Sequence, residues 1–425
     1  MRSYVITGPG RLEGSVRVEG AKNSALKLMA ASLGIPGEVV LNNVPRITDV
    51  FLMEQVLARL GAKVTFDSDR MTIDSSGELA QETPYELVTK MRASIEVLGP
   101  LLARLGRARV ALPGGDAIGS RPIDLHLRGL ELMGAKLKSE HGYVEAMADR
   151  LQGAEILLEF PSVGATDNLL MAAVTAEGRT TIDNAAREPE VQDLAAFLNA
   201  AGGKITGAGT TRIVIDGVDE LQPVEHTIVP DRIEAGTFAV GAAATRGDVT
   251  IEGVRPEHLT IPLQKLEQVG ADVTLGDTTL QVRLDARPRA MDLAILPYPG
   301  FPTDLQPMMM VLLAVSEGAA ILTENVFEAR WLFVDELNRM GSHIRIEGHH
   351  AVIRGVERLS GAPVRAPDIR AGAALVLAAL CADGYTTVYD VPHIERGYQD
   401  LDKKLKSLGA GIEVHDEPTG GWEVL

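Results

Sequence analysis

The segment LARLGAKVTF, residues 57–66, joins the end of a predicted amphipathic helix to a predicted strand through Gly61. A glycine just past a helix end adopts left-handed backbone without the steric penalty of a Cβ atom. The same pattern returns five more times, and the successive glycines are 73, 68, 68, 71 and 68 residues apart. They are Gly61, Gly134, Gly202, Gly270, Gly341 and Gly409. This near-constant period indicates one structural repeat built six times.

A second glycine series lies upstream, with one member in each repeat: Gly37, Gly106, Gly178, Gly247, Gly318 and Gly384. The segments before these glycines, such as NLLMAAVTA and MMMVLLAV, are apolar on nearly every side, which is typical of a buried helix. The later helix of each repeat, such as EVQDLAAFLNAA, has a polar face and is expected at the surface. Each repeat therefore predicts a strand, a buried helix, a strand, a surface helix and a further strand. The predicted fold is α/β, with two inside-out domains of three pseudo-symmetric repeats each, buried helices within and sheets outside.

The composition of the 425 residues narrows the possible functions. A net charge of −17 argues against general nucleic-acid binding. The single cysteine excludes an internal disulfide, and no run approaches 18 consecutive apolar residues. No His, Cys and carboxylate spacing resembles a metal site, and no motif indicates a cofactor. We therefore expect a soluble cytoplasmic protein with no metal, no cofactor and no nucleic-acid or membrane partner.

The second repeat carries an insertion. Its two glycines are 28 residues apart, compared with 23 to 25 in the other repeats. The extra residues fall in PGGDAIGSRP, residues 113–122, between a predicted strand and a predicted surface helix. Insertions on one face of a repeat scaffold are often functional, although a tolerated surface loop is the alternative.

Two registered sets of residues lie near the predicted helix starts. Near the buried helices they are Lys22, Arg92, Gly164, Arg232, Asp304 and Arg370. Before the surface helices they are Arg46, Arg121, Arg187, Arg255, Arg330 and Arg396. Helix N-termini attract anions, and added cations strengthen such sites. One such arginine alone would be interpreted as a surface salt bridge, but two sets in an acidic protein favour a substrate with several anionic groups.

Asp304 is the acidic exception among basic equivalents. Nearby cations would favour its carboxylate form, which suits a general base or an acceptor for a sugar hydroxyl. The alternative is an N-cap on the helix that begins DLQPMMM.

Several long motifs resemble the UDP-N-acetylglucosamine 1-carboxyvinyltransferase family of enolpyruvyl transferases. They include GAKNSALKLMAASL, PGGDAIGSRPIDLHLRGLELMGA, SVGATDNLLMAA, PDRIEAGTF, FPTDLQP, ENVFEAR, DIRAG and HIERGY. The resemblance runs from about residue 4 to residue 414 and implies the same inside-out architecture. It implies one domain of residues 1–21 plus 230–425, and another of residues 22–229 with a mobile loop at 112–122.

The family's reaction joins phosphoenolpyruvate to the 3′-hydroxyl of UDP-N-acetylglucosamine and releases phosphate, the first committed step of peptidoglycan synthesis. The resemblance implies three catalytic residues: Lys22, Asp116 and Asp304. For phosphoenolpyruvate it implies contacts with Lys22, Asn23, Arg121, Arg330, Arg370 and Arg396. For the uridine diphosphate it implies Arg121, Pro122, Ile123, Asp124, Leu125, Ser162, Val163 and Gly164. For the sugar it implies Arg92, Asp304 and Val326, and Arg232 and Asp368 complete the predicted substrate-binding set.

The predicted loop departs from the common family pattern, because Asp116 stands where most members have cysteine. A carboxyl group can deliver a proton to C3 of phosphoenolpyruvate when desolvation raises its pKa. It cannot act as a thiolate nucleophile, so we expect resistance to fosfomycin, an epoxide that alkylates the loop cysteine.

Three alternatives remain at the level of sequence. The first is a sister enzyme, 3-phosphoshikimate 1-carboxyvinyltransferase, whose GNAGTA-like helix start is absent here. The second is a catalytically silent paralogue that binds UDP-N-acetylglucosamine. The third is a ring-shaped clamp, which would place cations along its inner helices rather than at their starts.

Overall fold

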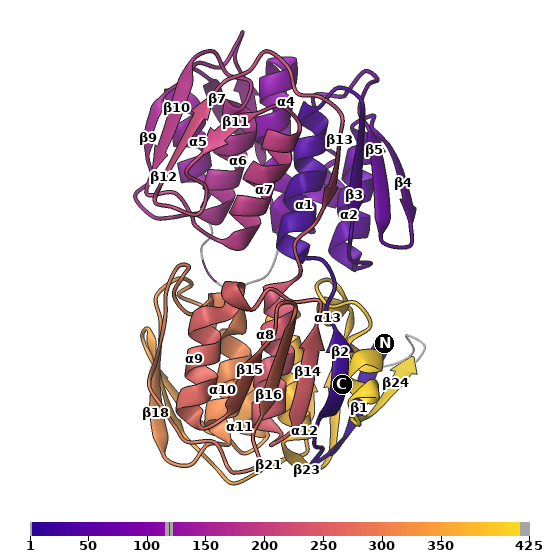
Figure 1. Ribbon diagram of the computed structural model, residues 1–425, viewed down its shortest axis with the longest axis vertical. Helices are drawn as coiled ribbons and strands as arrows, with labels where there is room; N and C mark the ends of the chain where they lie inside the picture. Colours follow the sequence, from indigo (N-terminus) through magenta and orange to yellow (C-terminus); the bar gives the residue numbers. More distant parts are fainter. Residues whose placement is uncertain (1, 115–118, 120–121, 417–425) are drawn as a thin grey trace. The chain divides into compact units, whose positions relative to one another are not determined.

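The computed structural model describes residues 2–114, 119 and 122–416, and these form two compact units. Unit 1 contains residues 2–19, 119 and 230–416, and unit 2 contains residues 20–114 and 122–229. Each unit surrounds its own hydrophobic core. Figure 1 shows helices at the centre of each unit and sheets around them.

The helices fall into the two predicted kinds. The inner helices are largely buried: α1 (Lys22–Ala31), α4 (Leu98–Leu105), α6 (Val163–Ala173), α8 (Arg232–Ala244), α10 (Gln306–Ala314) and α12 (Ile369–Leu380). The outer helices each expose one face: α2 (Thr48–Arg59), α5 (Asp124–Leu132), α7 (Pro189–Ala200), α9 (Thr260–Val269), α11 (Val334–Arg339) and α14 (Leu401–Ser407). The short helical segments are η1 (Ser32–Gly34), α3 (Tyr85–Val88), η2 (Arg92–Val97), η3 (Pro256–Leu259), η4 (Thr303–Leu305) and α13 (Pro392–Glu395). The α/β fold with buried helices and outer sheets is therefore confirmed.

Unit 2 has three sheets among its described residues. The first has the order β13 (Val224–Thr227), β3 (Glu38–Asn42), β5 (Arg70–Asp74), β4 (Lys63–Asp67). The second has the order β6 (Arg107–Ala111), β8 (Tyr143–Met147), β7 (Lys136–Glu140). The third has the order β11 (Lys204–Thr206), β12 (Arg212–Asp216), β10 (Arg179–Asp183), β9 (Glu155–Leu157). In the first and third sheets one parallel edge strand, β13 or β9, joins an antiparallel set.

Unit 1 repeats this plan. Its sheets have the orders β15 (Asp272–Leu275), β16 (Thr279–Arg283), β14 (Asp248–Glu252), β2 (Glu13–Arg17), and β17 (Leu293–Ile295), β18 (Ala319–Glu324), β20 (His350–Arg354), β19 (His343–Glu347). The third has the order β21 (Leu359–Ser360), β23 (Ala382–Tyr389), β1 (Arg2–Gly8), β24 (Gly411–Asp416), and β22 (Pro363–Arg365) also pairs with β23. The N-terminal strands β1 and β2 thus belong to two different sheets of unit 1.

The six glycines that define the repeat all adopt positive φ, between 84° and 109°. Five of the six upstream glycines do so as well, and Gly247 is the exception. There Arg246 takes the left-handed conformation instead, with φ of 55°. Gly247 is still required sterically, because a Cβ atom on it would lie 2.1 Å from the carbonyl oxygen of Leu12.

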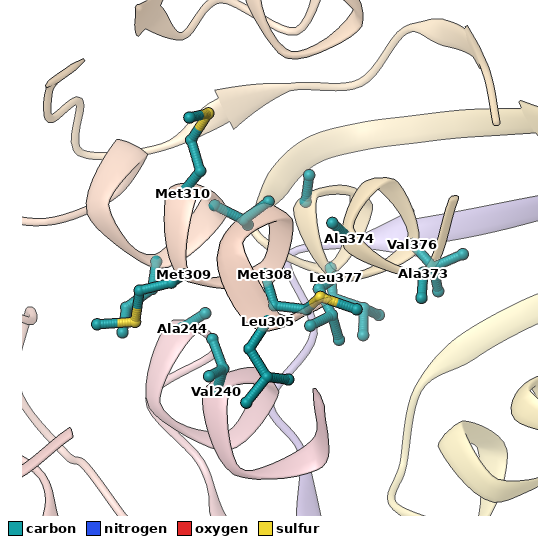
Figure 2. Packing of buried hydrophobic residues seen from close by; sticks show 14 of the residues in the cluster. Val240, Ala244, Leu305, Met308, Met309, Met310, Ala373, Ala374, Val376 and Leu377 are labelled. Carbon is teal, nitrogen blue, oxygen red and sulfur yellow. The ribbon is translucent and has the colours of Figure 1, made fainter. Parts of the chain in front are cut away.

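The core of unit 1 forms where α8, α10 and α12 pack together. Figure 2 shows Val240 and Ala244 of α8 beside Met308 and Met309 of α10, with Ala374 and Leu377 of α12 close by. All these side chains are buried. Small alanines between the larger side chains allow the helices to approach closely.

The inner helices of unit 2 differ from the prediction that inner helices are apolar. Helix α1 buries Lys27 and α6 buries Asp167, and the two side chains form an ion pair. Neutralisation of each charge by the other permits both side chains to lie inside the protein.

Candidate active site

In unit 1, Asp304 of η4 lies between two buried arginines. Its Oδ1 is 3.0 Å from Nη2 of Arg330, and its Oδ2 is 3.2 Å from Nε of Arg370. Each arginine side chain is less than 5% exposed, whereas the Asp304 side chain is 25% exposed. The carboxylate is therefore the accessible member of a buried cationic site. It is not the N-cap residue of η4 or of α10, because Pro302 and Leu305 occupy those positions.

Arg370 is held by the start of α12 and by Tyr398. Asp368 caps this helix, because its Oδ1 accepts hydrogen bonds from the backbone N–H groups of Arg370 and Ala371, each 2.9 Å long. Burial alone would lower the pKa of Arg370, but Tyr398 and Asp304 outweigh it and raise this pKa. Burial raises the pKa of Tyr398. Arg370 is therefore a permanent cation at the site.

Glu324 organises the loop that carries Val326 and Arg330. Its Oε1 accepts a hydrogen bond of 2.7 Å from the N–H of Val326, and its Oε2 accepts one of 2.9 Å from the hydroxyl of Thr303. The same hydroxyl accepts a 2.9 Å hydrogen bond from Nη1 of Arg330. Glu324 was not predicted, although it begins the ENVFEAR motif.

The remaining predicted residues of unit 1 lie at helix ends. Arg232 is the first residue of α8, where Asp231 caps the helix, and its guanidinium lies 5.5 Å from the ring centre of Tyr298. Arg396 follows α13 and is partly buried.

In unit 2, Lys22 and Asn23 begin α1. Nζ of Lys22 lies 2.9 Å from Oδ2 of Asp49 in α2, and both side chains are largely buried. Asn23 is partly buried. Asp49 was not predicted, because its distance from Lys22 in sequence gave no signal of contact. It holds the ammonium group at the start of the helix.

The other predicted residues of unit 2 also lie at starts of helices. Arg92 begins η2, and its Nη2 donates a 3.2 Å hydrogen bond to the carbonyl of Pro122. Ile123 is buried, and Asp124 and Leu125 begin α5. Ser162 caps α6, followed by Val163 and Gly164, with its hydroxyl 3.3 Å from the N–H of Ala165. Arg92 is thus joined directly to the segment that begins at Pro122.

Two predicted residues cannot be placed. Asp116 and Arg121 lie outside the described residues, which end at residue 114 and resume, apart from residue 119, at residue 122. Of the second arginine set, Arg46 stacks over Phe66, with its guanidinium 4.6 Å from the ring centre, and is exposed.

Across residues 2–114, 119 and 122–416, no cluster of three or more His, Cys, Asp or Glu side chains could hold a metal ion. Every described helix is too short or too polar to cross a membrane.

The comparisons with known proteins first define a class. Residues 6–405 match the family model EPSP synthase (3-phosphoshikimate 1-carboxyvinyltransferase). The enolpyruvyl transferase NikO from Streptomyces tendae has the same fold, with a TM-score of 0.89 at 28% identity over 98% of this chain and 99% of that chain. EPSP synthase from Acinetobacter baumannii gives a TM-score of 0.76 at 20% identity over 98% of this chain, a likeness of fold.

Curated relatives are more specific. UDP-N-acetylglucosamine 1-carboxyvinyltransferase from Corynebacterium jeikeium is 55% identical over 97% of this chain and 98% of its own length. The protein of that name from Thermotoga petrophila is 50% identical over 97% of this chain and 99% of its own length. The chain therefore belongs to the UDP-N-acetylglucosamine 1-carboxyvinyltransferase family.

Proposed function

We propose that this protein transfers the enolpyruvyl group of phosphoenolpyruvate to the 3′-hydroxyl of UDP-N-acetylglucosamine and releases phosphate. The observation that carries the proposal is the placement of Asp304, a partly exposed carboxylate between the buried cations Arg330 and Arg370. Support also comes from relatives of that name at 50–55% identity over nearly the whole chain.

The reaction proceeds by addition and elimination. The hydroxyl loses its proton to Asp304, its oxygen bonds to C2 of phosphoenolpyruvate, and C3 gains a proton from Asp116. C3 then returns a proton to the carboxylate of Asp116 while the bond from C2 to the phosphate oxygen breaks, which restores the double bond and releases phosphate. Proton transfers of this kind each accelerate a reaction by about 10²- to 10⁴-fold.

The two arginines give Asp304 a way to change from an ion-pair partner into a base. Arg330 and Arg370 are the proposed partners of the carboxylate of phosphoenolpyruvate. An incoming carboxylate that takes over part of their hydrogen bonding leaves the oxygens of Asp304 less neutralised and therefore more basic. Binding of one substrate would thus activate the base for the other.

The anionic groups of the substrates have proposed partners in both units. Lys22, held by Asp49, and Arg396 and Arg121 carry positive charge for phosphoenolpyruvate. The starts of α5 and α6 present backbone N–H groups, which suit the diphosphate of UDP-N-acetylglucosamine. Arg92 completes the sugar contacts.

The test is phosphate release by the purified protein with both substrates, with the product identified by mass as enolpyruvyl-UDP-N-acetylglucosamine. We expect release only when both substrates are present, and none when shikimate 3-phosphate replaces the nucleotide sugar. Release with phosphoenolpyruvate and shikimate 3-phosphate, but not with phosphoenolpyruvate and UDP-N-acetylglucosamine, would assign the sister activity. Binding of UDP-N-acetylglucosamine without release would identify a silent paralogue.

A further inference from the structure

Unit 2 contains a buried ion cluster, which we define as Lys27, Glu96 and Asp167. The three side chains come from α1, η2 and α6, and all three are buried. Nζ of Lys27 lies 2.6 Å from Oδ2 of Asp167. Lys27 also interacts electrostatically with Glu96, so the three groups form one cluster. No step of the proposed reaction uses them.

Stability does not explain the cluster. Oε2 of Glu96 and Oδ1 of Asp167 are buried and have no hydrogen-bond partner among the described residues. A buried ion pair contributes little net stability because desolvation offsets the attraction, and an apolar replacement of similar volume is often as stable. The groups are therefore costly to keep in a helix core that could be wholly apolar.

The cluster lies next to three predicted substrate contacts. Lys27 is five residues after Lys22 in α1, Glu96 is four after Arg92 in η2, and Asp167 is three after Gly164 in α6. These separations are about one turn of helix. Each member therefore lies on the same element as a predicted contact, a short distance along the chain from it.

Glu96 also touches the start of α6. Its Oε1 lies 3.1 Å from the point that a Cβ atom on Gly164 would occupy, and Nε2 of His126 lies 3.2 Å from the same point. Asn168 joins the neighbouring elements, since its Nδ2 lies 3.0 Å from the carbonyl of Ile95 and 3.1 Å from Nδ1 of His126. With Asn168 as the donor, His126 is neutral and carries its proton on Nε2. Polar groups of η2 and α5 therefore pack against the first half of α6.

We propose that Lys27, Glu96 and Asp167 are positioning residues for UDP-N-acetylglucosamine, and that through Lys27 of α1 they hold η2 and α6 in the arrangement that binds it. This inference rests on the proposed function. A misplacement of about 1 Å at a substrate contact can lower activity about 100-fold, so fixed helix starts matter. Burial raises the pKa of Glu96 to about 8, against the opposing effect of Lys27. Burial likewise raises the pKa of Asp167, and Lys27 opposes this rise.

The experiment compares four variants for the dissociation constant of UDP-N-acetylglucosamine by calorimetry, for KM and kcat, and for thermal unfolding. Asp167→Asn and Glu96→Gln change the cluster with little change of shape. The double variant Lys27→Met with Asp167→Leu makes it apolar. The matched control is Ser75→Ala, which removes a buried hydroxyl that donates to the carbonyl of Ile35 at 2.6 Å and accepts from Arg104 at 2.8 Å. Ile35 follows the end of α1, and Arg104 lies in the last turn of α4. Both contacts are therefore away from the start of α1, which carries a predicted substrate contact.

We expect Asp167→Asn and the apolar pair to raise the dissociation constant and KM for UDP-N-acetylglucosamine about 10- to 100-fold, with kcat changed much less. The apolar pair should unfold at or above the wild-type temperature, which separates positioning from stability. Ser75→Ala should lower the unfolding temperature and bind as the wild type does.

A pH profile gives a second measurement. Ionisation of Glu96 above pH 8 adds negative charge to a cluster surrounded by further charged and titratable groups, which are Arg92, His126 and Glu190. The affinity of the wild type for UDP-N-acetylglucosamine should therefore weaken between pH 7.5 and pH 9, and by more than the affinity of Glu96→Gln does. This range covers most of the ionisation of Glu96, which takes place within about one pH unit on either side of its pKa.

Unchanged dissociation constants in the cluster variants, with turnover by the wild type, would overturn this inference and leave the proposed function standing. A wild type that neither binds UDP-N-acetylglucosamine nor turns it over would overturn both.

Discussion

Oδ1 of Asp304 lies 3.0 Å from Nη2 of Arg330, although 26 positions separate the two residues along the chain. The other carboxylate oxygen meets Arg370, so the acid bridges two cations that would otherwise face each other inside unit 1. Removal of one partner from such a buried arrangement leaves uncompensated charge. The ion-pair contacts of Asp304 and its proposed role as a base therefore rest on the same two oxygens.

Asp304→Asn should lower kcat by about 10²- to 10⁴-fold, because an amide cannot accept the hydroxyl proton and its NH₂ group would face a guanidinium donor. Steady-state phosphate release measures the loss. Asp285→Asn is the matched control, since Asp285 is also held by two arginines but is exposed, and its kcat should stay at the wild-type value. A variant at Asp304 with normal kcat would exclude this residue as the base.

The aspartate in the predicted loop gives a prediction about inhibition. The wild type should keep its activity after long incubation with fosfomycin, because a carboxylate at position 116 offers no thiolate for the epoxide. Asp116→Cys should be inactivated progressively and gain the mass of the drug, while its turnover before exposure is retained. Time-dependent inactivation of the wild type with an adduct on Asp116 would contradict the prediction.

His126 should make unit 2 sensitive to acid. Burial, with the positive charges of Arg92 and Lys27, lowers the pKa of His126 from 6.5 to about 3. Between these values the unfolded chain binds more protons at this position, so the free energy of unfolding contributed by His126 rises with pH from 3 to 6.5. Below pH 6.5 that contribution is progressively lost.

The measurement compares urea midpoints from pH 4.5 to pH 7.5 for the wild type and His126→Asn. The variant should show a shallower rise in this window, whereas His141→Asn, at an exposed histidine in the same unit, should parallel the wild type. Parallel curves for all three proteins would mean that His126 is protonated without cost.

Replacement of a repeat glycine by alanine should destabilise the protein through backbone conformation alone. Gly202 has φ of 100°, and nothing lies within 4 Å of a Cβ atom placed on it. Gly202→Ala should lower the free energy of unfolding by about 1–2 kcal/mol, measured by urea titration. Gly77→Ala is the matched control, because Gly77 also has open space but lacks the positive φ. Equal effects of the two substitutions would show that backbone conformation is not the cause.

The sequence predicted the architecture well because glycine caps and apolar periodicity are local signals. Gly61 and its five equivalents mark helix ends whatever they pack against, and the apolar segment of α10 must be buried in any fold. Gly247 shows the limit of this inference. It is required by the close approach of Leu12, which lies 235 positions earlier in the chain, and its neighbour Arg246 makes the left-handed turn.

The candidate site was predicted less completely. Position in the repeat and family motifs pointed to Lys22 and to Asp304 with its two arginines, but not to Asp49, the acid that holds Lys22. Asp49 lies in an outer helix, and Lys27 and Asp167 are 140 positions apart on two inner helices that this ion pair joins. Such pairs depend on tertiary packing, which no local pattern encodes.

The placement of β1 has a consequence for synthesis on the ribosome. This strand pairs with β23 and β24, so its partners emerge almost 400 residues after it. The strands and helices of unit 2 are all available once residue 229 has emerged, and a contiguous segment of this kind can fold while translation continues. The first residues synthesised are therefore among the last to pair with their partner strands. Both edges of β1 remain unpaired while most of the chain is being translated.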